Sequence, residues 1–387
     1  MSPDRLFLVA AEPSGDLLAR EVVEAYRKFA PETEFSAIGG QELASVGLSS
    51  PIDTSPLAIL GIFDGLKVYG EVLRLADQAT DMIIDFKPDA VILVDSWGFM
   101  IRVAERLQQR APHIKVIKLV GPQIWATRSG RAKKLAKVID HLICIHPMEV
   151  PYYEPLGLPV TVMGNPALSR TQQGDGAGYR AAQGIAEWQD LVLILPGSRP
   201  SEINRVAPVL VEAAKQLEAA RDSVKLVFAP APAIRDMFLE RFPELAEAGQ
   251  VAAADTSRFD IMAAADLALA CSGTVTSELA VQGTPFIVGY KAGWMTWVVA
   301  RFFLYKPNHI TLLNIAADDT EIAPEFLQTK FTPDRVSGCA LSLLTDKTVL
   351  DAQREAQDQA LSRMGEVETP AAEIAAQAIR DALVSGR

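Results

Sequence analysis

The sequence predicts an α/β protein of two domains, each a doubly wound parallel sheet, with a cleft between them. The length of 387 residues exceeds what one hydrophobic core usually serves. Short apolar runs, typical of buried strands, alternate with longer segments of helical periodicity. A polar, glycine-rich stretch at Thr171–Gly178 divides the chain into two such series and has the composition of a linker. We therefore expect domains at residues 1–170 and 178–345, then a helical tail at residues 346–387 that packs on another domain or subunit.

Composition and charge exclude several classes of protein. A hydrophobic content of 49% and a charged content of 22% are ordinary for an α/β protein, and the net charge of -11 disfavours nucleic acid as a partner. The three cysteines are far apart and form no CxxC or Cys/His cluster, so we expect no zinc site, no disulfide framework and a reducing, cytoplasmic compartment. The first apolar run is too short for a signal peptide, and no run reaches the ~18 residues of a spanning helix.

The first half of the chain carries carboxylates directly after its predicted strands. Glu12 and Asp16 follow the first strand, and Asp95 follows the third. Because the carboxyl ends of parallel strands lie at one edge of a sheet, we expect these acids at the cleft, where one can take a proton from an attacking hydroxyl. Asp16 has a structural alternative, since an Asp in the first turn of a helix caps it. The expected strands are Leu6–Ala11, Phe35–Ile38, Ala90–Val94, Lys115–Val120, Leu142–Ile145 and Val160–Met163, with helices at Leu17–Phe29 and Ile101–Arg110.

The second half carries two small turns after its predicted strands. Gly197-Ser198-Arg199 follows the first strand, and Ser272-Gly273-Thr274 follows the fourth. Free N–H groups at a helix start, together with the guanidinium of Arg199, suit a diphosphate. Glu278, one helical turn beyond Thr274, can then accept hydrogen bonds from two ribose hydroxyls. The expected strands are Leu191–Leu195, Lys225–Ala229, Val251–Ala254, Leu267–Cys271 and Pro285–Tyr290, with helices at Ile203–Ala220, Ala233–Arg241 and Val275–Gln282 and an extended segment at Pro307–Asn314.

Both assignments in the second half have a structural alternative. Arg199 either contacts a diphosphate or forms an ion pair with Glu202, and Glu278 either faces the ligand or is a solvated carboxylate beside a buried turn. The four histidines have no spacing for a metal or a catalytic triad, and no Walker A loop or nucleophile elbow is present. We therefore expect neither a metal nor a cofactor.

Three further segments are open to a structural or a membrane interpretation. The apolar segments Leu57–Leu75 and Gly293–Tyr305 are either buried helices or helices that lie on a membrane. The basic run Arg128–Lys137 is either a solvated helix face or a contact for anionic head groups or phosphate.

Taken together, the motifs resemble the lipid-A-disaccharide synthases, a family of inverting glycosyltransferases with the GT-B fold of two Rossmann-like domains. Their order and spacing, from about residue 6 to residue 330, make the resemblance specific, whereas LPGSR alone would be weak. The matching segments are AEPSGD (Ala11–Asp16), KPD…VDSWGF (Lys87–Phe99), GPQIWA (Gly121–Ala126), LPGSR (Leu195–Arg199), SGTVTSE (Ser272–Glu278), VGYK (Val288–Lys291) and LLN (Leu312–Asn314).

The resemblance implies transfer of a sugar from UDP-2,3-diacylglucosamine to 2,3-diacylglucosamine 1-phosphate, giving the β-1,6-linked lipid A disaccharide phosphate and UDP. Asp95 would be the general base, with Glu12 and Asp16 as further catalytic candidates and Ser14, Gly15 and Gln123 on the sugar or acceptor side. The resemblance also implies peripheral contact with the inner face of the inner membrane, and it allows a homodimer. The residues that would hold UDP are Gly197, Ser198, Arg199, Ser272, Gly273, Thr274, Thr276, Glu278 and Asn314.

The chain departs from the family pattern at several motif positions. The family usually has Gly at Ala11, Pro at Trp97 and a second Asp at Gly98. If that second Asp were the base, this chain would have lost it; Asp95 is the acid that the turn retains. The alternatives are a divergent member with altered acyl preference, another UDP-sugar GT-B enzyme such as a UDP-N-acetylglucosamine transferase or epimerase, and a non-catalytic nucleotide-sugar or lipid-binding protein.

Overall fold

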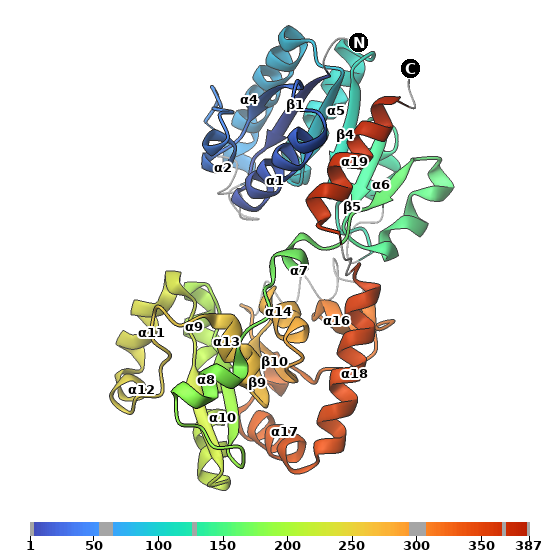
Figure 1. Ribbon diagram of the computed structural model, residues 1–387. Coiled ribbons are helices and arrows are strands. Elements are labelled where there is room, and N and C mark those ends of the chain that lie inside the picture. The colour runs from blue at the N-terminus through green and yellow to red at the C-terminus, as the bar shows by residue number, and fades with distance from the viewer. Residues whose placement is uncertain (1–3, 54–64, 126–129, 294–306, 366–368, 385–387) are drawn as a thin grey trace. The chain divides into compact units, whose positions relative to one another are not determined.

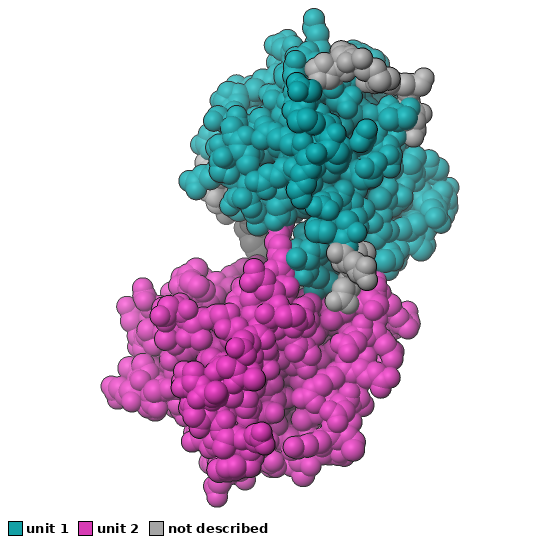
Figure 2. Space-filling view, viewed as in Figure 1, with its two compact units in different colours: residues 1–169, 367–387 teal, residues 170–366 magenta. Residues whose placement is uncertain are grey.

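A computed structural model of the chain describes residues 4–53, 65–125, 130–293, 307–365 and 369–384 (Figure 1). It divides into two compact units, which Figure 2 colours separately. Unit 1 comprises Met1–Ser169 and Val367–Arg387, and unit 2 comprises Arg170–Glu366. Each unit is built around one parallel sheet with helices on its faces, so the predicted α/β class with two doubly wound sheets is confirmed.

Unit 1 contains a six-stranded sheet in the order β2-β1-β3-β4-β5-β6, and every pair of neighbours is parallel. Its strands are β1 (Arg5–Ala10), β2 (Glu34–Ile38), β3 (Ala90–Val94), β4 (Lys115–Leu119), β5 (His141–Cys144) and β6 (Val160–Val162). Its helices are α1 (Pro13–Phe29), α2 (Gln41–Ser45), α4 (Gly65–Phe86), α5 (Trp97–Arg110), α6 (Gly130–Leu135), α7 (Pro166–Arg170, at the unit boundary) and α19 (Ala371–Val384), with short 3-10 helices at Pro147–Tyr152 and Glu154–Leu156.

The strands of unit 1 are apolar on both faces because helices cover both. Side chains alternate along a strand, so Leu6 and Leu8 lie on one face of β1 while Phe7 and Val9 lie on the other. The first face packs against α1 and α19, and the second packs against α4 and α5 (Figure 1). This two-sided burial explains why these strands appear in the sequence as continuous apolar runs.

Unit 2 contains a five-stranded parallel sheet in the order β11-β10-β9-β7-β8. Its strands are β7 (Asp190–Leu195), β8 (Val224–Phe228), β9 (Leu267–Cys271), β10 (Phe286–Tyr290) and β11 (Glu325–Leu327). Its helices are α8 (Gly176–Ala182), α9 (Pro200–Arg205), α10 (Ala207–Ala220), α11 (Arg235–Arg241), α12 (Pro243–Glu247), α13 (Arg258–Ala264), α14 (Val275–Val281), α16 (Leu312–Ala316), α17 (Pro333–Thr345) and α18 (Lys347–Arg363), with 3-10 helices at Pro232–Ile234 and Gln328–Lys330.

The chain after residue 345 is shared between the units. Helix α18 packs on α14, α16 and α17 of unit 2, and α19 packs on α1, β4 and β5 of unit 1. Ala375, Ala376 and Ile379 of α19 are buried in the core of unit 1. The last helix therefore completes the sheet cover of the unit that contains the N-terminus.

The glycine-rich stretch that the sequence suggests as a linker is fastened to unit 2. The N–H of Gly174 donates to Gln282 Oε1 at 2.9 Å, and that of Asp175 donates to Asp260 Oδ1 at 2.9 Å. A Cβ on Gly174 would lie 2.1 Å from the carbonyl oxygen of Phe259, so only glycine permits this approach to α13. These glycines serve close packing rather than chain flexibility.

Three element predictions are wrong in part. The helix expected over Ile203–Ala220 is broken at Val206, because Pro208 has no N–H to continue the first helix. The strand expected at Val251–Ala254 is a single bridge between Val251 and Phe228. In the segment expected to be extended up to Asn314, helix α16 begins at Leu312.

Several sequence predictions lie outside the described residues. These are residues 57–64 of the first apolar segment, residues 294–305 of the second and Arg128 of the basic run. Within the part of the chain that the structure describes, no helix combines the length and the apolarity needed to cross a membrane.

Candidate functional site

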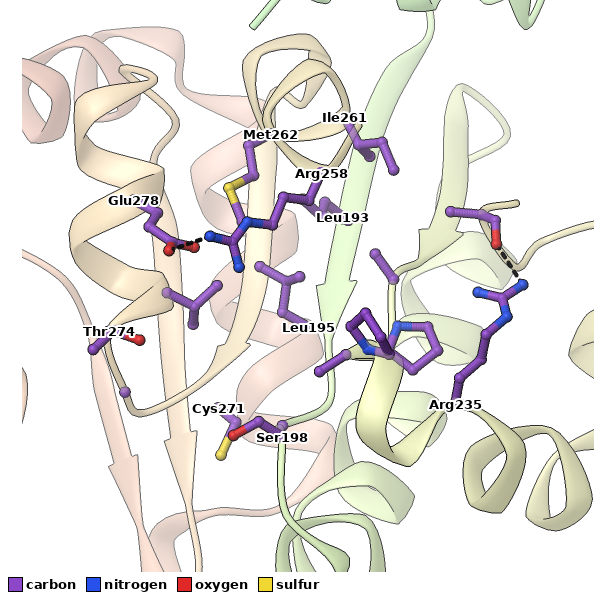
Figure 3. A pocket seen from close by; sticks show the side chains of 18 of the residues that line it. Leu193, Leu195, Ser198, Arg235, Arg258, Ile261, Met262, Cys271, Thr274 and Glu278 are labelled. Atoms are coloured by element: carbon purple, nitrogen blue, oxygen red, sulfur yellow. Dashed lines mark hydrogen bonds and ion pairs between the residues drawn. The ribbon is translucent and has the colours of Figure 1, made fainter. Parts of the chain in front are cut away.

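The two small turns of unit 2 come together at one edge of its sheet. Strands β7 and β9 are neighbours, with Leu195 paired to Ala270, so the turns that follow them lie side by side. A cavity of about 460 Å³ opens there (Figure 3). Six residues that the sequence predicts for ligand binding line it: Gly197, Ser198, Ser272, Gly273, Thr274 and Glu278.

The cavity joins an apolar wall to a polar end. Leu193, Leu195, Ile261 and Met262 line the wall, and Pro230 and Pro232 extend it. Figure 3 shows Glu278 and Arg258 at the same end of the cavity, near Met262. Pockets of this kind suit a ligand with a flat, partly apolar part and a few hydrogen-bonding groups. Sequence analysis missed this wall, because its prolines and the residues of α13 lie outside the two turns that carry the motifs.

Glu278 is the acidic group of this cavity. It is buried on α14, and its Oε1 accepts a hydrogen bond from Arg258 Nη2 at 2.8 Å. Burial raises the pKa of Glu278, and the charge of Arg258 acts in the opposite direction. The solvated alternative for Glu278 is thus wrong, since its side chain is only 11% exposed and lines the cavity.

The turn after β7 differs from the expectation. The carboxylate of Glu202 accepts hydrogen bonds from the N–H groups of Ser198 at 2.7 Å and Arg199 at 3.2 Å, so these amides are not available to a diphosphate as they stand. Arg199 Nη1 also contacts Glu202 Oε1 at 3.2 Å, which is the ion pair that the sequence leaves as an alternative. Arg199 is not among the residues that line the cavity, and its side chain is 72% exposed.

The turn after β9 keeps its N–H groups open. Among the residues that the structure describes, none accepts a hydrogen bond from the N–H of Gly273 or Thr274. Thr276 is buried, and its hydroxyl donates to the carbonyl of Gly273 at 2.8 Å. Thr276 therefore stabilises this turn through the Gly273 carbonyl and is not among the residues that line the cavity.

Asn314 has a structural environment. It is fully buried, and its Nδ2 donates to the carbonyl of Ala323 at 2.8 Å and to Glu325 Oε1 at 3.0 Å. Its Oδ1 accepts from the N–H groups of Ile322 at 3.0 Å and Ala323 at 2.9 Å. All hydrogen-bonding positions of its side-chain amide are used within unit 2, so this side chain has none left for UDP.

The variant Asn314→Ala is expected to destabilise unit 2 by roughly 2–4 kcal/mol, because two N–H groups and a carbonyl lose buried partners. Urea unfolding measures this loss, and UDP titration of the folded protein should show little change. The control Asn204→Ala removes an exposed contact with Arg241 and should cost less than about 0.5 kcal/mol. A variant of normal stability that no longer binds UDP would contradict this assignment.

Unit 1 brings its predicted site residues to one sheet edge. Strands β1, β3 and β4 are neighbours and end in register at Ala10, Val94 and Leu119. Glu12, Asp95 and Gln123 follow these three ends. Within the described ranges, neither the Glu12 nor the Asp95 carboxylate has a hydrogen-bond donor, and both are half-buried.

The first turn of α1 approaches the Asp95 turn closely. A Cβ on Gly15 would lie 3.7 Å from Asp95 Cβ and 3.4 Å from Val94 Cγ1, while Ser14 beside it is exposed. Gly15, with Ser14 beside it, therefore lies near Asp95 at the carboxyl edge of the sheet, where the sequence predicts these residues.

Asp16 differs from the other two acids. It is buried, and its two carboxylate oxygens accept hydrogen bonds from the N–H groups of Gly40 and Glu42, both at 2.8 Å. Asp16 thus caps α2 rather than its own helix. With both oxygens engaged, it is a structural residue, and we leave it out of the proposed catalytic set.

Two buried ionisable residues lie under this edge, and sequence analysis missed both. Lys118 on β4 is 2% exposed, and burial lowers its pKa to about 7, although the charges of Asp95, Glu12 and Glu149 act in the opposite direction. Glu149 is 3% exposed, and burial raises its pKa to about 7 against the effects of two backbone amides and Lys118. The sequence feature that could have indicated Lys118 is the position of this lysine inside the apolar run Lys115–Val120, which predicts a buried strand.

The buried Glu149 makes the stability of unit 1 depend on pH. Its pKa in the folded state lies above the ordinary 4.5, so its contribution is fully present below pH 4.5 and is lost as the pH rises through about 7. The full loss is about 3 kcal/mol. Glu149→Gln, which cannot ionise, should therefore lose less of its urea midpoint between pH 5 and pH 8 than the unchanged protein. The exposed Glu154→Gln is the control; equal declines in all three proteins would contradict the expectation.

Comparisons with known proteins point in one direction. The lipid-A-disaccharide synthetase family profile matches residues 6–379. A lipid-A-disaccharide synthase of Rhodospirillum centenum is 32% identical over 381 residues, which cover 98% of this chain and 94% of that protein. One of Ruegeria pomeroyi is 33% identical over 389 residues, with coverage of 98% and 95%.

Solved structures agree with the fold. The UDP-GlcNAc 2-epimerase of Neisseria meningitidis, solved with UDP-GlcNAc bound, aligns with a TM-score of 0.57 and 12% identity over 99% of this chain and 100% of that one. At this identity the likeness concerns the fold alone. Together with the two parallel sheets, it confirms the predicted GT-B class; the cleft stays a prediction.

Proposed function

The chain belongs to the lipid-A-disaccharide synthetase family and is a hexosyltransferase of lipid A disaccharide synthesis, and from this premise we propose which of its residues bind and react. The donor is UDP-2,3-diacylglucosamine, and the acceptor is 2,3-diacylglucosamine 1-phosphate. The 6-hydroxyl oxygen of the acceptor attacks the anomeric carbon of the donor sugar. The bond from that carbon to the diphosphate breaks, UDP leaves with the electron pair, and the product is β-1,6-linked.

UDP binds in the cavity of unit 2. The observation that carries this assignment is the convergence of both small turns and Glu278 on one cavity of about 460 Å³. The N–H groups of Gly273 and Thr274 and the hydroxyls of Ser198, Ser272 and Thr274 bind the diphosphate, whose growing charge during departure they stabilise. Glu278 accepts from the ribose, and the apolar wall takes the uracil ring.

Arg199 binds the diphosphate by exchanging its ion-pair partner Glu202 for a phosphate oxygen. Its guanidinium is largely exposed, and its ion-pair partner among the described residues is Glu202 at 3.2 Å, so a phosphate oxygen can replace that carboxylate at small cost. The planar fork of arginine suits a diphosphate better than a single carboxylate oxygen.

Asp95 of unit 1 is the general base. Its carboxylate lies at a sheet edge and has no donor among the described residues, so it is available to accept the proton of the acceptor hydroxyl. Glu12, on the neighbouring strand end, is the second acid of this edge, and Ser14, Gly15 and Gln123 line the acceptor side. No metal or cofactor takes part in this scheme.

Both substrates carry acyl chains, which supports a peripheral position at the inner face of the inner membrane. Lys133, Lys134 and Lys137 are exposed near α6 and offer cations to anionic head groups. A homodimer is compatible with this peripheral position at the membrane.

The test is a direct assay. Purified protein incubated with the diacyl donor and the diacyl acceptor should release one UDP for each disaccharide phosphate formed. Donor hydrolysis without disaccharide would refute the transfer. Conversion of UDP-N-acetylglucosamine to its 2-epimer would favour the epimerase alternative, which family membership does not support.

A further inference from the structure

The ammonium group of Lys118 is buried between the ends of two strands of unit 1. Its Nζ donates to the carbonyl oxygens of Leu93 at 3.1 Å, Asp95 at 2.6 Å and Leu119 at 3.2 Å. An ammonium has three N–H donors, and here each has a main-chain acceptor. Lys118 therefore ties the end of β3, the turn after it and the end of β4 to one point.

The backbone around this point is unusual. Asp95 and Ser96 have φ values of 49° and 35°, and Val120, directly after Leu119, has 67°. Residues other than glycine rarely adopt this left-handed region, and a β-branched valine does so least of all. Such conformations persist only where the surroundings determine them. The carbonyls that Lys118 holds belong to Asp95 itself and to the residue before Val120.

The charge of Lys118 suits the same location. Asp95, Glu12 and Glu149 are the carboxylates whose charges act on it, and burial opposes them. The charges of these three carboxylates thus favour the charged form of Lys118. A residue without donors in its place would remove one hydrogen bond from each of these three main-chain carbonyls.

We propose that Lys118 is a positioning residue for sugar transfer: its ammonium clamps the left-handed turn after β3 and so fixes the direction of the Asp95 carboxylate. The inference rests on the proposed role of Asp95. Lys118 acts through the main chain and does not contact a substrate. Displacement of a catalytic group by about 1 Å can lower a rate ~100-fold, so a loosened turn should affect the chemical step.

The first test is Lys118→Met, which keeps much of the side-chain length and removes the donors. We expect kcat to fall about 10- to 100-fold while the Kd for UDP, which binds to unit 2, stays within about twofold. Hydrogen exchange of the Asp95 amide, which donates to the carbonyl of Leu119 at 2.9 Å, should accelerate. The control Lys115→Met removes another lysine of β4, whose Nζ donates to the carbonyl of Ala382, and should leave kcat and Asp95 exchange unchanged.

A double variant separates positioning from general loss of structure. If Lys118 acts through Asp95, then Lys118→Met should not lower the residual rate of Asp95→Asn any further. An equal fold-loss in both backgrounds would overturn the proposal, as would an unchanged kcat in Lys118→Met. If the Met variant does not fold, Lys118→Leu, which also removes the donors, takes its place; wild-type kcat in folded Lys118→Leu would also overturn the proposal.

Hydrogen exchange of the Asp95 amide tests this inference independently of the proposed function. If the unchanged protein forms no disaccharide, the proposed function fails, and the clamp is judged by Asp95 exchange alone. Unchanged exchange in folded Lys118→Met would overturn the clamp whatever the assay shows.

Discussion

Asp95→Asn is expected to lower kcat for disaccharide formation by roughly 10²–10⁴-fold, which is the usual contribution of a general base. Asparagine matches the shape of aspartate but cannot take up the proton of the acceptor hydroxyl at neutral pH. The main-chain contacts of the turn, from Lys118 to the carbonyl of residue 95 at 2.6 Å, do not involve the side chain and should persist. The measurement is initial rate at saturating donor and acceptor, together with the Kd for UDP, which should not change.

The matched control for Asp95 lies at the opposite end of the same strand. Asp89 precedes β3, and its Oδ2 accepts a hydrogen bond from the N–H of Arg5 at 2.9 Å. Asp89→Asn carries the same chemical change at the amino edge of the sheet and should retain kcat. If Asp95→Asn turned over at the normal rate, Asp95 would be excluded as the base, and Glu12 on the neighbouring strand end would be tested next.

Glu278→Gln is expected to weaken UDP binding about tenfold or more. Hydrogen bonds to a charged acceptor contribute roughly 1.5–3 kcal/mol, and ~1.4 kcal/mol corresponds to a factor of ten in Kd. Glu278 is buried in the cavity wall with Arg258 as its partner at 2.8 Å, so its carboxylate is held in place before the ligand arrives. Calorimetric titration with UDP measures the change. Glu244→Gln alters an exposed pair with Lys215 on unit 2 and should leave Kd unchanged.

A second ligand identifies the group that Glu278 contacts. The unchanged protein should prefer UDP to 2′-deoxy-UDP, and Glu278→Gln should lose most of that preference if the carboxylate accepts from the ribose hydroxyl. A variant that binds both ligands more weakly but keeps the preference would assign Glu278 to another part of the cavity. Normal UDP affinity in Glu278→Gln would remove it from the site.

The sequence by itself determined the class of fold and the edges at which the site residues lie. Strand β3 at Ala90–Val94 and strand β9 at Leu267–Cys271 have the bounds that their apolar runs predict. Asp95 and Ser272 come directly after them. All strands of a parallel sheet have their carboxyl ends at the same edge. The strand bounds therefore suffice to assign these residues to that edge. The ordered motifs also indicated the family that the comparisons then showed.

Only the tertiary structure decided which of these residues are available to a ligand. Asp16 is engaged by amides of Gly40 and Glu42, which lie 24 and 26 residues further along the chain, whereas Asp95 at the same edge has no such donor among the described residues. Asn314 is likewise engaged by the segment from Ile322 to Glu325. The physical reason is that spacing fixes the direction of a side chain relative to its own strand or helix. Its hydrogen-bond partners come from segments that only the folded chain brings near, and those partners determine whether a polar group holds the protein together or remains open to a substrate.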